Sequence, residues 1–291
     1  MLSVRRTSPY KVNEVFESRS YVSMGYTMNY RLYVPKNYDC GEMYPLVVFL
    51  HGSDERGDDN CAQLKNGLQV MFDDVTSPIY DSIVLVPQCP KCSWWTLANI
   101  GERGYSIADT PEARELEVLC EIMDEISGYY NVDEDRVYVT GISMGGFGTW
   151  DLLSRHGARF AAGMPICGGG DPSYAKLLGR IPIRVFHGSA DECVPVALSR
   201  SMYAAIRREG GEQISYTEFD GGGHVIWDSV YGDRDNVDWL FAQSRRERRL
   251  KVERAGKIKK AAIFGGIGAV VSAVLVMAGV KKLSKKKNKK K

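Results

Sequence analysis

The stretch VYVTGISMGGFGTWDLL, residues 137–153, decides the fold because its two halves favour different secondary structures. The first half is apolar and β-branched, as in a buried strand, and the second half has the composition of a helix. Gly141, Ser143 and Gly145 stand at the junction. Small residues suit a tight strand-to-helix turn that exposes a serine hydroxyl. A Gly-x-Ser-x-Gly match is weak by itself in a chain with 30 glycines. The stretch therefore indicates a nucleophile elbow or an ordinary glycine-rich turn.

Strand-like and helix-like segments alternate around this stretch. The clearest helical pattern is TPEARELEVLCEIMDEISGYYN, residues 110–131, with Thr110 as its expected N-cap and Pro111 as its first helical residue. Other helices are expected just after Ser143 and over 195–208. Strand-like runs occupy 30–34, 46–50, 83–86, 137–140, 161–166, 181–186 and 214–219. This alternation predicts an α/β fold with a mostly parallel sheet and helices on both faces.

A catalytic serine needs a histidine base that is oriented by a carboxylate. In the strand–turn–helix setting of the elbow, these residues follow in the order serine, acid, histidine. His224, in the glycine-rich loop FDGGGHVIWD, is the expected base, and Asp191, in IRVFHGSADECVPV, is the expected acid. Glu192 is the neighbouring alternative for the acid. His187 ends a strand four residues before Asp191.

The reaction also needs donors for an oxyanion. The N–H of Met144, directly after the serine, supplies the first one. The loop after the strand at 46–50, in VVFLHGSDERGDDN, supplies the second, and Ser53 N–H is the best candidate. In the same loop His51 is interpreted as a structural histidine.

The stretches YRLYVPKNY, YPLVVFLHGSDERGDDN, VLVPQCP, VYVTGISMGGFGTWDL, FHGSADECVPV and GGGHVIW together resemble the α/β-hydrolase superfamily. They are most similar to its carboxylesterase and feruloyl-esterase-type branch, which is related to prolyl oligopeptidase-like and dienelactone hydrolases. The resemblance spans roughly residues 21–242 and implies an eight-stranded sheet. It implies Ser143 as nucleophile, Asp191 as acid, His224 as base, and Met144 and Ser53 as oxyanion donors. It implies hydrolysis of carboxylic esters through an acyl-enzyme, without a metal or an organic cofactor.

The substrate is less well defined by the sequence. Trp94, Trp95 and Tyr105 lie in a long connection and are expected either to line an acyl or aryl pocket or to pack in the core. The short segment 168–180 leaves no room for a large cap, which indicates an open site. Small-molecule or lipid esters are therefore expected. A lipase or thioesterase acting at a membrane and a prolyl-oligopeptidase-like peptidase are the enzymatic alternatives. A non-enzymatic scaffold is disfavoured because all three triad residues are present.

The seven cysteines do not form the spacing of a disulfide framework. Cys89 and Cys92 form a CxxC pair, which by itself supplies too few ligands for a structural zinc site. The basic charge is concentrated near the C-terminus. Residues 245–260 contain nine Lys or Arg against two Glu, and residues 281–291 contain eight Lys and no acid. The rest of the chain is acidic, so the basic charge is a local feature of the tail. A lysine tail suits anionic lipid headgroups or nucleic acid. The apolar run next to it favours the membrane, so nucleic acid is not an expected partner.

Residues 261–280, AAIFGGIGAVVSAVLVMAGV, contain no charge. As a helix they would span about 30 Å, the thickness of the hydrocarbon core of a bilayer. The expected organisation is therefore a lead-in (1–20), a catalytic domain (21–244), a basic connector (245–260), a transmembrane helix (261–280) and a lysine-rich tail (281–291). The N-terminal residues MLSVRRTSPYKVNEV lack an apolar run, so we expect a tail anchor with a cytoplasmic catalytic domain. Both flanks are basic, which leaves the orientation open, and the oligomeric state is also open.

Overall fold

The computed structural model describes residues 11–97 and 105–254. The chain divides into two compact units, Met1–Ser244 and Arg245–Lys291. In the second unit the described residues, 245–254, are helical.

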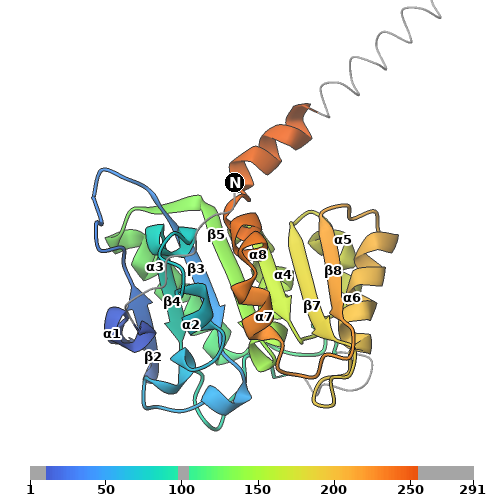
Figure 1. The fold of residues 1–291 in the computed structure, drawn as a ribbon, viewed down its shortest axis with the longest axis horizontal. Coiled ribbons are helices and arrows are strands. Elements are labelled where there is room, and N and C mark those ends of the chain that lie inside the picture. The colour runs from blue at the N-terminus through green and yellow to red at the C-terminus, as the bar shows by residue number, and fades with distance from the viewer. Residues whose placement is uncertain (1–10, 98–104, 255–291) are drawn as a thin grey trace, which may run out of the picture. The chain divides into compact units, whose positions relative to one another are not determined.

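The first unit is built on one sheet (Figure 1). Within the described residues eight strands pair in the order β1-β2-β4-β3-β5-β6-β7-β8. β1 and β2 are antiparallel to each other, and β2 is antiparallel to β4. The other pairs are parallel. The strands are β1 Glu17–Ser23, β2 Tyr26–Tyr33, β3 Tyr44–Leu50, β4 Ile83–Pro87, β5 Val132–Ile142, β6 Ala162–Ile166, β7 Ile183–Gly188 and β8 Ile214–Phe219.

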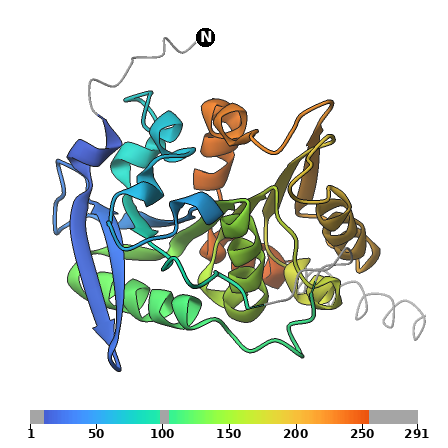
Figure 2. The ribbon, with the colours of Figure 1, turned by 90° about the horizontal axis from the view of Figure 1, so that it is seen from below.

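Helices cover both faces of the sheet, as the two helical layers in Figure 2 show. One apolar core lies beneath α3, α4, α5 and α6, and the other lies beneath α1, α2, α7 and α8. The α-helices are α1 Val12–Val15, α2 Leu68–Met71, α3 Arg114–Tyr129, α4 Met144–His156, α5 Ala175–Leu178, α6 Ala197–Arg208, α7 Trp227–Gly232 and α8 Arg234–Phe241. Short 3-10 helices are η1 Ser53–Glu55, η2 Ala62–Leu64, η3 Pro78–Asp81, η4 Gly157–Arg159 and η5 Pro172–Tyr174.

The central strand β3 shows how the sequence produces this layering. Val48 and Leu50 belong to the core beneath α3 and α4, whereas Val47 and Phe49 belong to the other core. Successive side chains of a strand point to opposite faces, so a strand that is apolar at every position must be covered on both sides. The predicted mostly parallel sheet with helices on both faces is confirmed.

Two local predictions were incomplete. No strand was predicted over β1, because this edge strand is largely exposed and its sequence ESRSYVS is mostly polar. The helix predicted from Thr110 begins instead at Arg114, after Ala113 in extended conformation. The Thr110 carbonyl accepts a hydrogen bond from Arg155 of α4 at 2.8 Å, and Glu112 binds His156. These contacts hold residues 110–113 against α4, so the helix begins only at Arg114.

Among the described residues, no helix combines the length and the apolar character that crossing a bilayer requires. The predicted transmembrane run, 261–280, lies outside those residues. Residues 255–260 of the predicted connector and the lysine-rich tail, 281–291, also lie outside them.

Candidate active site

Ser143 stands on a strained turn between β5 and α4. Its φ is +53° and its ψ is −117°, a conformation that L-residues rarely adopt. Glycines make the turn feasible, because a Cβ on Gly145 would lie 2.0 Å from the Leu50 carbonyl oxygen and one on Gly141 would lie 2.4 Å from the Gly145 oxygen. The Ser143 N–H donates to the Ile166 carbonyl at 2.9 Å and anchors the turn to β6. The geometry is that of a nucleophile elbow.

The three residues predicted to form a triad lie together. His224 Nε2 is 2.8 Å from Ser143 Oγ, and His224 Nδ1 is 2.7 Å from Asp191 Oδ2. Ser143 follows β5, Asp191 follows β7 and His224 follows β8, so they meet where the carboxyl ends of parallel strands share one edge of the sheet. The His224 ring is also packed edge-on against Trp227, with ring centroids 5.5 Å apart.

Groups other than His224 also hold the Asp191 carboxylate in place. Its Oδ1 accepts hydrogen bonds from the N–H groups of Cys193 and Val194, both at 2.9 Å. Its side chain is fully buried, which acts to raise the pKa. Hydrogen bonds from His224 and the two backbone N–H groups outweigh burial and lower the pKa of Asp191 below its ordinary value. The neighbouring Glu192 is exposed.

A second histidine contacts the same carboxylate. His187 Nε2 lies 3.1 Å from Asp191 Oδ2 and 3.0 Å from the Val194 carbonyl, and Nδ1 lies 2.7 Å from Ser199 Oγ. His187 is fully buried, and this burial lowers its pKa. Because both groups at Nε2 are acceptors, this nitrogen carries the proton. The sequence placed His187 near the acid but did not indicate this contact.

The expected oxyanion donors border the same space. Met144 is the first residue of α4 and Ser53 is the first residue of η1, so neither N–H is used by its own helix. A Cβ on Gly52 would lie 3.7 Å from Ser143 Cβ, which shows how closely this loop approaches the elbow. Behind it, buried Glu55 accepts a hydrogen bond from Asn66, and its pKa is raised by burial.

A pocket of about 800 Å³ opens at Ser143. Its wall combines apolar side chains with a few polar groups, as in many small-molecule sites. The lining residues are Gly52, Ser53, Asp54, Glu55, Asn66, Trp94, Thr96, Ile142, Ser143, Met144, Phe147, Cys193, Val194, Pro195, His224, Val225 and Trp227.

Of the three aromatic residues expected at the pocket, the structure places one there. Trp94 lines it, and the Arg56 guanidinium covers the Trp94 ring at 4.1 Å. Trp95 is fully buried and donates from Nε1 to the His51 carbonyl at 3.1 Å. Tyr105 is buried and donates to Asp151 at 3.0 Å. For Trp95 and Tyr105 the pocket role is therefore wrong and the alternative of core packing is confirmed, because both side chains are buried and hydrogen-bonded within the fold.

His51 has structural contacts on both ring nitrogens. Nδ1 donates to the Gly52 carbonyl at 2.6 Å, and Nε2 accepts from the Cys89 N–H at 3.0 Å. Burial lowers the pKa of His51 to about 4. The CxxC cysteines are both free thiols. Cys89 is buried, which raises its pKa, and Cys92 is exposed.

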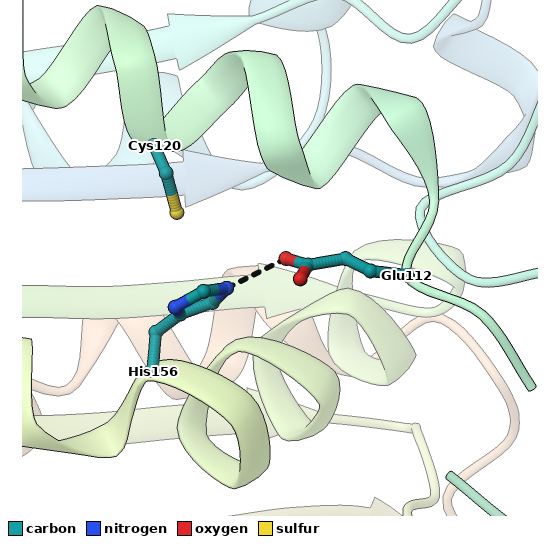
Figure 3. A group of neighbouring side chains, drawn as sticks. All are labelled: Glu112, Cys120 and His156. Carbon is teal, nitrogen blue, oxygen red and sulfur yellow. Dashed lines mark hydrogen bonds and ion pairs between the residues drawn. The ribbon is translucent and has the colours of Figure 1, made fainter. Parts of the chain in front are cut away.

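Among the residues that the structure describes, two groups of side chains have the donor types and proximity that metal binding requires. One is Cys167, Asp191 and His224. There the Cys167 thiol donates to the His224 carbonyl at 3.3 Å, and burial raises the pKa of Cys167 to about 12. The second group is Glu112, Cys120 and His156, between α3 and α4 (Figure 3).

The strand order and the serine elbow define the class of this protein as an α/β-hydrolase. A family model named Esterase matches residues 22–268, and the chain belongs to this esterase family. A solved thermostable esterase is 36% identical, with a TM-score of 0.72 over 80% of this chain and 64% of its own chain. A curated relative, the bifunctional acetylxylan esterase/xylanase XynS20E of Neocallimastix patriciarum, is 27% identical over 55% of this chain. The chain spans only 21% of that relative's length.

More distant structures share the fold. A solved ferulic acid esterase is 19% identical, with a TM-score of 0.59 over 78% of this chain and 98% of its own. The acylaminoacyl peptidase of Pyrococcus horikoshii is 18% identical, with a TM-score of 0.53 over 78% of this chain and 40% of its own. Together with the family match, these likenesses confirm the α/β-hydrolase resemblance.

Proposed function

We propose that the protein is a serine esterase in which Ser143 is the nucleophile, His224 the general base and Asp191 the residue that orients the base. The observation that carries this proposal is the continuous hydrogen-bond chain from Ser143 Oγ through both His224 nitrogens to Asp191 Oδ2. Asp191 accepts from Nδ1–H, which leaves the Nε2 lone pair facing the serine hydroxyl.

The reaction proceeds in two steps. His224 takes the Ser143 proton while Oγ attacks the ester carbonyl, and the oxyanion is bound by the N–H groups of Met144 and Ser53. His224 then gives the proton to the departing alcohol, which leaves an acyl group on Ser143. Water, deprotonated by His224, hydrolyses this acyl-enzyme in the second step. No metal or organic cofactor takes part in these steps.

Replacement of Ser143 by Ala tests the proposal. The variant should hydrolyse p-nitrophenyl acetate several orders of magnitude more slowly, since the nucleophile and the residues that activate it act as one unit. An unchanged rate in Ser143→Ala would refute the assignment.

The pocket supports an ester with an apolar acyl group and a hydroxyl-bearing alcohol. Phe147, Val194 and Trp227 supply apolar surface, whereas Asp54 and Asn66 supply groups that bind hydroxyls. The curated relative whose name includes acetylxylan esterase is consistent with such an alcohol. We therefore expect higher kcat/KM for acetyl and aryl esters of sugars than for alkyl esters of matched acyl groups. Equal kcat/KM values across this panel would contradict the proposed alcohol specificity.

A lipase or thioesterase is the second candidate, and the uncharged run 261–280 favours it. For both candidates we propose that this run tethers the enzyme to a membrane. Membrane association of the full chain, retained in alkaline carbonate and lost when Val271 and Leu275 are both replaced by Lys, would support the tether. Fractionation with soluble proteins would contradict it. Adding long-chain esters and acyl thioesters in detergent to the substrate panel separates the two candidates.

A further inference from the structure

Three side chains with metal-binding atoms meet at the end of α4 that lies away from the elbow. Their ligand atoms, one each from Glu112, Cys120 and His156, all lie within 4.8 Å of one another. His156 Nε2 is 2.6 Å from Glu112 Oε1. In Figure 3 the Cys120 side chain points from α3 toward the His156 ring on α4, and Glu112 approaches the same ring from the segment before α3.

These donors match the preferences of one ion. A thiolate, an imidazole and a carboxylate are all ligands of Zn²⁺, with bond lengths of about 2.0–2.3 Å. A tetrahedral site with such bonds needs about 3.3–3.8 Å between donor atoms. Here one pair of ligand atoms is 2.6 Å apart and the other pairs are at most 4.8 Å apart. Small side-chain rotations therefore suffice to bring the three atoms to the separations of a tetrahedral site.

The burial of the group also suits a metal site. Cys120 is 8% exposed, whereas the side chains of His156 and Glu112 are 30% and 19% exposed. The site is therefore closed on the side of α3 and open toward solvent, where a water molecule can supply a fourth ligand.

We propose that Glu112, Cys120 and His156 bind one Zn²⁺ ion that joins α3, α4 and the segment preceding α3. The non-helical segment 110–113 brings Glu112 to His156 in place of a further helical turn, which fits this purpose. The site is separate from the esterase chemistry, because α4 extends about 20 Å between Ser143 and His156. The ion stabilises the helix that carries the elbow.

The charges of the ligands match the charge of the ion. A Cys120 thiolate, formed as metal binding releases the thiol proton, and the Glu112 carboxylate together balance the two positive charges of Zn²⁺.

Cobalt reports the site directly. The full chain, stripped with chelator, is titrated with Co²⁺, and the thiolate-to-cobalt charge-transfer absorption is recorded. One equivalent of Co²⁺ should produce the band, and Zn²⁺ should displace it. Cys120→Ser should abolish the band, and His156→Gln should weaken binding at least tenfold. Zn²⁺ should raise the Tm of the wild type by several degrees and leave that of Cys120→Ser unchanged.

Controls separate this site from the other thiols. Cys92→Ser should bind Co²⁺ like the wild type, and esterase activity of Cys120→Ser should equal that of the wild type, which verifies folding. The proposal is overturned if the wild type gives no band, or if the band persists in Cys120→Ser. Zinc that binds equally to Cys120→Ser and inhibits the esterase would place the ion at Cys167, Asp191 and His224 instead.

Discussion

At the residue scale, the Asp191 carboxylate is the most heavily used group of the candidate site. It accepts hydrogen bonds from two backbone N–H groups on Oδ1, and two imidazoles contact Oδ2. The sequence motif left Asp191 and Glu192 as alternative acids, because a one-residue difference in a loop has no periodic signature. The folded loop separates them, since Asp191 is buried against His224 and Glu192 is exposed.

This difference predicts a contrast between two isosteric variants. Asp191→Asn should lower kcat for p-nitrophenyl acetate by about 10⁴, because an amide favours the wrong tautomer of His224. Glu192→Gln, the matched control, should stay within about twofold of the wild type. Steady-state kinetics on both variants provide the measurement. Similar losses in the two variants would show that the acid is misassigned.

His187 should matter for the rate without touching the substrate. His187→Leu removes the Nε2 donor from a buried carboxylate, and a hydrogen bond to a charged group contributes about 1.5–3 kcal/mol. If losing this hydrogen bond raises the activation free energy by that amount, because Asp191 is no longer held in place, kcat falls roughly ten- to hundredfold while KM stays nearly constant. His187→Gln, which keeps an N–H donor, should recover part of the rate. A rise in KM alone would contradict this positioning role.

At the element scale, the elbow requires that β3, β5 and α4 approach one another closely. The sequence predicted this turn well, because glycine spacing and the change from strand to helix composition are local features. A Cβ at Gly145 would meet backbone, which cannot rotate away. Gly145→Ala should therefore lower the free energy of unfolding by about 3 kcal/mol or more.

Gly128 in α3 is the matched control for this substitution. A Cβ there meets nothing within 4 Å, so Gly128→Ala should raise the free energy of unfolding by up to about 1 kcal/mol. Urea denaturation of both variants tests the pair. Comparable destabilisation at the two positions would disprove the argument from close approach.

Other elements were beyond prediction from local pattern. The N-terminal end of α3 is decided by contacts of Thr110 and Glu112 with α4, which lie about 45 residues away in sequence. Likewise, Trp94 and Trp95 are adjacent in the chain, yet one lines the pocket and the other is in the core. Neither the start of α3 nor the different placement of the two tryptophans has a sequence signature. Both depend on contacts with residues that are distant in sequence and close only in the folded chain.

At the scale of the whole molecule, buried histidines make stability depend on pH. Burial lowers the pKa of His51 from 6.5 to about 4. Between these values the unfolded chain binds more protons than the folded one, so the free energy of unfolding decreases as pH falls from 6.5 to 4. The full contribution, up to roughly 3 kcal/mol, is present above pH 6.5. His187, whose pKa is also lowered, acts in the same direction.

Urea denaturation at pH 7 and pH 4.5 measures this effect. The wild type should lose more stability between the two pH values than His51→Gln, by about 2 kcal/mol. Equal losses in both proteins would show that His51 does not titrate in this window.

The α/β-hydrolase class could be predicted from the order of motifs along the whole chain. Serine, acid and histidine each follow a parallel strand at the same edge of the sheet. The shape of the pocket was not predictable, since residues from the segments after β3, β4, β5, β7 and β8 form it together. The proposed zinc group was missed for a similar reason, because its residues are spread over 45 positions.

The role of Ser143 as nucleophile is tested most directly by covalent labelling of the full chain with a fluorophosphonate, followed by intact mass measurement and peptide mapping. We expect one adduct on Ser143 of the wild type, none on Ser143→Ala, and labelling slowed by orders of magnitude in His224→Ala. An adduct on a different residue, or labelling of Ser143→Ala at the wild-type rate, would contradict this role.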